Sequence, residues 1–168
     1  YYGVAPSILR ALIDQWRETV PPYPIDRYTF LDVGAGKGRG LLVASQYRFR
    51  NVVGIELNPA MAAIARENVA AWVADHATDA TAAALAPIEV LEQDALDLQL
   101  PGGPTLLFLF HPFEAPVLRQ LLRRIKSQWV ERRKDSPGRA LDLLYVNAEC
   151  ADVLDRDAEF SQLFLGSV

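Results

Sequence analysis

The sequence has 168 residues, of which 51% are hydrophobic, and it carries a formal net charge of −4. A chain of this length predicts one domain with a substantial apolar core. The negative charge excludes a general attraction to nucleic acid or to an anionic membrane, and the single cysteine, Cys150, excludes an internal disulfide.

The N-terminal region predicts a helix followed by a break. Residues 4–20 place apolar side chains at helical spacing, with Ser7 as the expected N-cap, and prolines within residues 21–24 end the helix. We therefore treat residues 1–24 as the entry to a single domain that covers residues 1–168.

A glycine-rich loop dominates the next segment, which reads TFLDVGAGKGRG from Thr29 to Gly40. A β-branched and aromatic run, then glycines, then apolar residues predict a buried strand, a tight loop and a helix start. The glycines permit positive φ angles and let a ligand approach the main chain. Such a loop before a helix favours binding of a negative or polar ligand, and an ordinary turn does not need three glycines at every second position.

The spacing of the glycines narrows the choice of ligand. A dinucleotide fingerprint needs a third glycine at position 39 or 41, where the sequence has Arg39 and Leu41. A triphosphate loop needs Ser or Thr after Lys37, where the sequence has glycine. The pattern that fits is D-x-G-x-G-x-G beginning at Asp32, whose carboxylate repels a pyrophosphate but suits an ammonium or sulfonium group.

This segment resembles motif I of the class I S-adenosylmethionine-dependent methyltransferases. The resemblance implies that S-adenosylmethionine is the cofactor and that the loop binds its amino-acid part. The residues assigned to this part of the site are Asp32, Gly34, Ala35, Gly36 and Gly38. In the family a short N-terminal segment often folds over the methionine end of the cofactor, a role open to Tyr1 and Tyr2; a frayed terminus is the alternative.

A second strand is predicted over residues 51–56, after a crossover helix over residues 41–47. It ends in Glu56, 22 positions beyond Gly34, where an open α/β sheet places its second strand end beside the first. A carboxylate there can accept two charge-assisted hydrogen bonds from a ribose diol. We assign Glu56 and the adjacent Leu57 to cofactor binding; the alternative for Glu56 is a solvent-facing strand end.

The following segment predicts a long helix, with Asn58 as N-cap and Pro59 as first helical residue. The alanine-rich tract toward Leu85 predicts more helix or an irregular extension. His76 has no second ligand-type neighbour at metal-binding spacing, so we predict a surface histidine and no metal site. One face of the helix holds Met61, Ile64, Ala65, Asn68 and Trp72, and we expect Met61 in the core.

The third predicted strand, over residues 88–95, also ends in an acid, Asp94, followed by Ala95. In the methyltransferases that the chain resembles, the equivalent acid accepts the adenine amino group and the next backbone amide meets the ring nitrogens. The resemblance therefore assigns Asp94 and Ala95 to the adenine. Asp97 is a competing candidate, and a simple turn aspartate is the alternative.

A fourth, strongly apolar strand is predicted over residues 105–110, buried on both faces of the sheet. It ends at His111, where the methyl acceptor should approach. Histidine titrates near neutral pH, so we name His111 as the candidate catalytic base; a structural histidine is the equal alternative. DNA and RNA amino-methyltransferases carry Asp or Asn, two prolines and an aromatic here, and this chain does not, which favours a small-molecule or protein acceptor.

Another helix is predicted from Glu114 onward, with one apolar and one basic stripe. The basic stripe predicts a solvated face, and a nucleic-acid patch is the alternative, which no interleaved aromatic residues support. The apolar stripe holds Leu118, Leu121, Leu122, Ile125 and Trp129. The basic stripe holds Arg119, Arg123 and Lys126, extended by Arg132, Arg133 and Lys134.

The remaining sequence completes a predicted α/β fold, a doubly wound and mostly parallel sheet with helices on both faces. Residues 140–146 predict a fifth strand, residues 147–155 a short helix and residues 160–168 a last strand. The class I methyltransferase fold has seven strands, the last antiparallel, so we expect the terminal hairpin to be incomplete. The sequence begins at Tyr1 without a methionine, and we expect it to be a trimmed piece of a longer protein.

Three functions are therefore considered. The first is a methyltransferase that uses S-adenosylmethionine and an unidentified acceptor. The second is a cofactor-binding domain without independent activity, and the third is an NAD(P)-dependent oxidoreductase, which the glycine spacing opposes. No leader and no long apolar span occurs in the sequence, so we expect a cytoplasmic protein without membrane partners.

Overall fold

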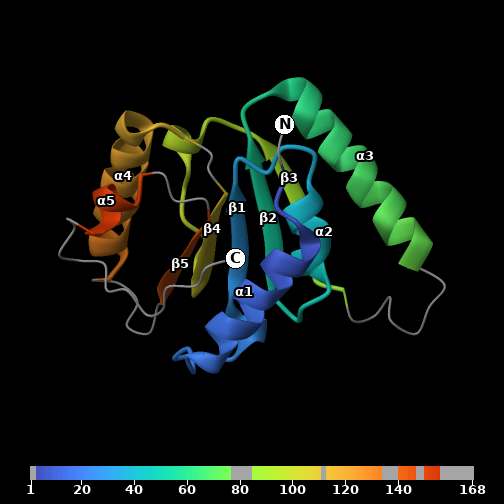
Figure 1. Cartoon of the computed structure of the whole chain (residues 1–168), viewed down its shortest axis with the longest axis horizontal. Coiled ribbons are helices and arrows are strands. Elements are labelled where there is room, and N and C mark those ends of the chain that lie inside the picture. The colour runs from blue at the N-terminus through green and yellow to red at the C-terminus, as the bar shows by residue number, and fades with distance from the viewer. Residues whose placement is uncertain (1–2, 77–84, 111–112, 134–139, 147–149, 156–168) are drawn as a thin grey trace.

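In the part of the chain that the structure describes, five parallel strands form one central sheet (Figure 1). The computed structural model describes residues 3–76, 85–110, 113–133, 140–146 and 150–155. The strand order is β3-β2-β1-β4-β5, and every neighbouring pair is parallel. The strands are β1 (Thr29–Val33), β2 (Asn51–Glu56), β3 (Ile88–Glu92), β4 (Thr105–Phe110) and β5 (Leu141–Val146).

Helices cover both faces of the sheet, which confirms the predicted doubly wound α/β fold (Figure 1). On one side lie α1 (Pro6–Glu18), α2 (Arg39–Ser45) and α3 (Pro59–His76). On the other lie α4 (Ala115–Arg133) and α5 (Ala151–Asp155). Short 3₁₀ helices, η1 (Ile25–Arg27) and η3 (Ala95–Asp97), stand before β1 and after β3. None of the described helices is long and apolar enough to cross a bilayer.

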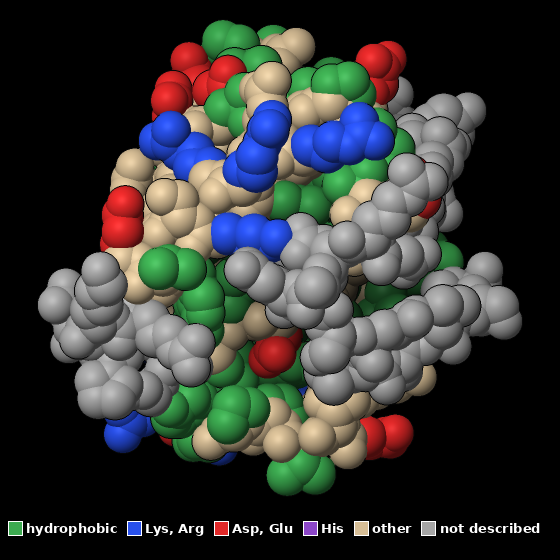
Figure 2. Space-filling view, turned by 90° about the vertical axis from the view of Figure 1, so that its left-hand side faces the viewer, with side chains coloured by type: hydrophobic (Ala, Val, Ile, Leu, Met, Phe, Trp, Pro, Cys, Tyr) green, Lys and Arg blue, Asp and Glu red, His purple; other side chains and the backbone are tan. Residues whose placement is uncertain are grey.

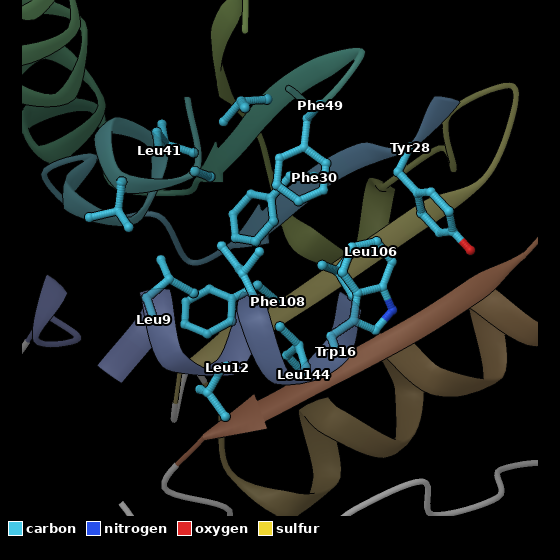
Figure 3. Packing of buried hydrophobic residues seen from close by; sticks show 14 of the residues in the cluster. Leu9, Leu12, Trp16, Tyr28, Phe30, Leu41, Phe49, Leu106, Phe108 and Leu144 are labelled. Atoms are coloured by element: carbon cyan, nitrogen blue, oxygen red, sulfur yellow. The ribbon is translucent and has the colours of Figure 1, made fainter. Parts of the chain in front are cut away.

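Alternate residues of the central strands enter two separate apolar clusters. Phe30 of β1 and Phe108 of β4 stack at a ring-centroid distance of 5.7 Å under α1 (Figure 3). Leu31, which follows Phe30, and Leu107, which precedes Phe108, enter the cluster under α4. Every residue of β1 is buried, as expected for a central parallel strand with both faces covered.

The start of α1 differs from the prediction, because Ala5 and not Ser7 is its N-cap. Pro6 occupies the first helical position, where its fixed φ angle fits the helix and its missing N–H is not needed. The indole nitrogen of Trp16, on the buried face of α1, donates to Asp142 Oδ2 of β5 at 3.1 Å. This bond links the first helix to the last described strand.

The other boundaries agree with the prediction to within a few residues. Helix α2 begins two residues before the expected start and β3 ends before Asp94. Helix α5 lies within the helix expected over residues 147–155. His76, predicted at the surface, is half-buried, with its ring centroid 3.9 Å from that of Trp72. The helical extension toward Leu85 and the sixth strand fall largely outside the described residues, so the incomplete hairpin stays a prediction.

Helix α4 shows the predicted separation of apolar and basic stripes. Leu118, Leu121, Leu122 and Ile125 are buried, whereas Arg119 and Arg123 are exposed. Figure 2 views the side of the molecule that carries α4 and α5, and Lys and Arg side chains gather in its upper half. Whether this basic face binds nucleic acid or is only solvated stays open.

Candidate active site

The loop between β1 and α2 has the conformation that its glycines allow. Gly34, Gly36 and Gly38 have φ angles of 86°, 56° and 83°, a region that other residues rarely adopt. The backbone N–H groups of Gly34 and Ala35 both donate to the carbonyl oxygen of Ile55 at 2.9 Å. The loop is therefore fastened to β2, the neighbouring strand.

Glu56, the last residue of β2, fixes the same loop from a second direction. Its Oε2 accepts the N–H of Gly36 at 2.8 Å, and its Oε1 accepts the N–H of Asn58 at 2.9 Å. The side chain is half-buried, and a carboxylate has about four acceptor positions, so each oxygen can accept a further bond. The sequence pattern marks Glu56 as a ligand-binding residue, but it does not reveal that the carboxylate also holds the glycine loop.

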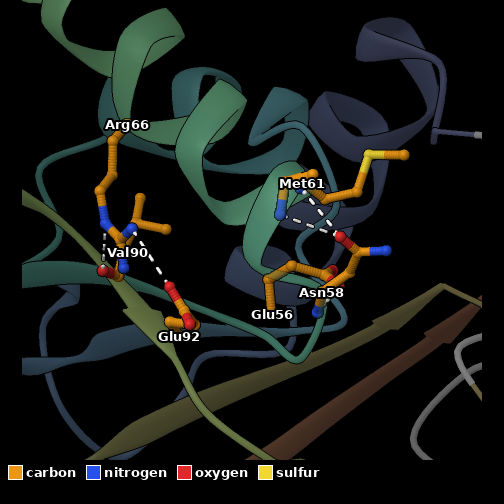
Figure 4. Close-up of polar contacts among 7 residues, drawn as sticks. Glu56, Asn58, Met61, Arg66, Val90 and Glu92 are labelled. Carbon is orange, nitrogen blue, oxygen red and sulfur yellow. Dashed lines mark hydrogen bonds and ion pairs between the residues drawn. The ribbon is translucent and has the colours of Figure 1, made fainter.

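Helix α3 starts directly beside Glu56, with Asn58 as its N-cap as predicted. Asn58 Oδ1 accepts the N–H groups of Ala60 and Met61 at 3.0 and 3.3 Å (Figure 4). Between Glu56 and Asn58 stands Leu57, whose side chain is 65% exposed. An exposed leucine next to a fixed carboxylate offers an apolar surface at the carboxyl edge of the sheet.

Asp32, within β1, is the most perturbed acid of the site. It is only 4% exposed, and its carboxylate forms no hydrogen bond or ion pair with another described residue. Burial, aided by the negative charge of Glu56, raises the pKa of Asp32 to about 7. A buried polar group without a protein partner indicates strain, an ordered water or a ligand.

A small cavity of about 30 Å³ lies against Asp32. Gly3 and Val4 line it from the N-terminal segment, and Phe110 lines it from the end of β4. The lining also includes Arg39, the first residue of α2. In the sequence, Arg39 opposes a dinucleotide fingerprint, and its place directly after Gly38 also marks it as a neighbour of the loop.

The third predicted acid, Asp94, lies just beyond β3. The N–H of the preceding Gln93 donates to the carbonyl oxygen of Glu56 at 3.0 Å, which places the ends of β2 and β3 side by side. Asp94 Oδ1 accepts the N–H of Leu96 at 2.8 Å and so caps η3. Ala95 is buried, whereas the competing Asp97 is exposed. Asp94 thus directly follows the residue that bonds to the end of β2, whereas Asp97 lies three positions further along, at the end of η3.

The candidate catalytic base is His111. His111 and Pro112 fall outside the described residues, so the proposed role of His111 stays a prediction. Phe113, the next described residue, is half-buried and packs against the cluster under α4. Within the described part of the chain, no group of three metal-ligating side chains occurs.

Comparison of the sequence with models of known protein families gave a match. A family model described as a methyltransferase domain matches residues 30–129, from β1 into α4. The chain belongs to the class I methyltransferase superfamily. A search of curated proteins gave no match.

Solved structures share the fold of this methyltransferase domain. One is an S-adenosylmethionine-dependent methyltransferase from Clostridium acetobutylicum, with 14% identity, a TM-score of 0.52, and coverage of 71% of this chain and 44% of that one. Another is PKMT2 from Rickettsia typhi, with 17% identity, a TM-score of 0.47, and coverage of 62% and 19%. The chain thus spans less than half of each of these proteins. The Clostridium structure, with a TM-score of 0.52 and only 14% identity, shows a common fold and nothing more.

Proposed function

We propose that the protein transfers a methyl group from S-adenosylmethionine to an acceptor. The observation that carries the proposal is Asp32, a buried and unpartnered carboxylate beside the positive-φ glycine loop. A cation supplied by a ligand offsets the unfavourable burial of this charge, whereas a pyrophosphate would increase it. The loop therefore suits an amino acid or sulfonium group better than a dinucleotide, which leaves the oxidoreductase alternative without support.

The remaining acids suit the rest of the same cofactor. The free acceptor positions of Glu56 are available to a ribose diol, and exposed Leu57 provides apolar surface for an adenine ring. Asp94 and Ala95 are proposed to bind the polar edge of the adenine. When bound, S-adenosylmethionine supplies an electrophilic methyl, so the protein's main task is to hold the two reactants in line.

The acceptor site is proposed at the end of β4, beyond Phe110. His111 follows there and could accept a proton from an amine, hydroxyl or acid. The register from Phe110 to Phe113 lacks the Asp or Asn that would bind a nucleobase amine, so we favour a small molecule or a protein as acceptor.

Calorimetric titration tests the cofactor assignment. We expect S-adenosylmethionine and S-adenosylhomocysteine to bind and NAD and NADP not to bind. Glu56→Ala should weaken binding, whereas Glu89→Ala, at an exposed acid of β3, should not. Absence of binding by both adenosyl compounds would refute the proposal. Binding without methyl transfer to any acceptor by a longer native chain would instead support the domain without independent activity.

A further inference from the structure

We infer that Arg39 binds the carboxylate of the cofactor's amino-acid end, opposite Asp32, which faces the ammonium. The inference rests on the proposed function and adds a residue to it. Asp32 and Arg39 line the same small cavity, one from β1 and the other from the first turn of α2. The cavity is thus lined by one acidic and one basic residue. Such a pair suits a zwitterionic ligand, whose ammonium and carboxylate groups lie a few bonds apart.

The position of Arg39 has no evident structural reason. It is the first residue of α2, where the exposed N–H groups of the helix make a positive charge unfavourable. Its side chain is exposed and forms no hydrogen bond or ion pair with another described residue. An anionic ligand in the cavity would give this guanidinium a partner.

The two charged groups do not neutralise each other. Contact with a guanidinium would lower the pKa of Asp32, yet that pKa is raised by burial and by Glu56, and Arg39 is not among its causes. Both side chains are therefore available to a third group. Gly34 and Ala35 of the glycine loop line the same cavity, which places both charged residues next to the loop.

A pair of ligands that differ by one carboxylate tests the inference. S-adenosylhomocysteine and its decarboxylated analogue, S-adenosyl-3-thiopropylamine, are titrated into the wild type and Arg39→Ala by calorimetry. The wild type should prefer S-adenosylhomocysteine. Arg39→Ala should lose about 10–100-fold in affinity for it, because a charge-assisted bond is removed, and should bind the analogue as before.

Two further variants sharpen the result. Arg39→Lys keeps the charge and should retain part of the preference. Arg48→Ala removes an equally exposed cation beyond the other end of α2 and should leave the preference unchanged. Thermal unfolding of each variant checks that the fold is kept.

Each outcome decides between the two proposals. If Arg39→Ala keeps the wild-type preference, or loses affinity equally for both compounds, the assignment of Arg39 is wrong while the proposed function stands. If the wild type binds neither compound, the proposed function fails and the assignment of Arg39 fails with it.

Discussion

Asp32 provides the most direct physical test of the site, through the pH dependence of stability. Its pKa is about 7 in the folded protein and 3.8 in the unfolded reference, because burial and Glu56 disfavour the charged form. The folded state therefore holds this proton more tightly than the unfolded state. As the pH rises above about 4, the unfolded chain ionises first, and the folded protein loses stability until Asp32 itself ionises near pH 7.

The size of the effect follows from the two pKa values. A difference of about three units, at about 1.4 kcal/mol each, gives a loss of about 4 kcal/mol between pH 4 and pH 8. Asp32→Asn keeps the shape and cannot ionise, so it should avoid this loss. We expect the variant and the wild type to diverge with rising pH, with the variant more stable at pH 8.

Urea unfolding of the ligand-free protein at intervals from pH 4 to pH 8 measures the divergence. Asp26→Asn, at an exposed aspartate of η1, is the matched control and should follow the wild type. Parallel profiles for Asp32→Asn and the wild type would refute the raised pKa and with it the unpartnered state of Asp32. The same variant should bind S-adenosylhomocysteine more weakly at pH 8, because its amide cannot neutralise the ligand's ammonium.

Three further predictions concern the edge of the sheet. Glu56→Ala should weaken cofactor binding by about 1.5–3 kcal/mol, measured by calorimetry against Glu92→Ala as control, and equal affinities would remove Glu56 from the site. Gly40→Ala places a methyl group 2.5 Å from an oxygen of Asp32, so it should lower both cofactor affinity and thermal stability. As a control, the methyl group of Gly102→Ala meets no atom within 4 Å, so this variant should change neither quantity. His111→Gln should lower turnover by about 10²–10⁴-fold with cofactor affinity kept, and equal losses of turnover and stability would mark a structural histidine.

The parts of the fold that depend on local chemistry could be predicted from the sequence. The bounds of β2 and β4 match the prediction because their apolar runs end abruptly at polar or proline-containing turns. Asn58 and Pro59 form the predicted helix start because capping depends on neighbouring residues only. The N-cap of α1 was predicted wrongly at Ser7, since serine is the better cap by type but Pro6 determines where the helix begins.

The parts of the site that depend on tertiary contacts could not be predicted. Nothing in the sequence around Glu56 indicates that its carboxylate bonds to Gly36, 20 positions earlier. The raised pKa of Asp32 likewise depends on coverage of both faces of β1, which no local pattern shows. The place of Arg39 at the cavity of Asp32 also depends on the folded loop, so the sequence alone does not predict it.

The contacts of Glu56 explain how one acid can serve both the fold and the proposed cofactor. Before any ligand binds, its carboxylate already fixes the glycine loop and the start of α3, and Ile55 holds the loop from the backbone. Little conformational entropy then remains to be lost when the cofactor binds, so more of the contact energy contributes to affinity. Removing Glu56 should consequently weaken contacts made by the loop as well as those made by its own oxygens. In the proposed function, the carboxyl ends of β1, β2 and β3 therefore recognise the cofactor, and the segment after β4 selects the acceptor.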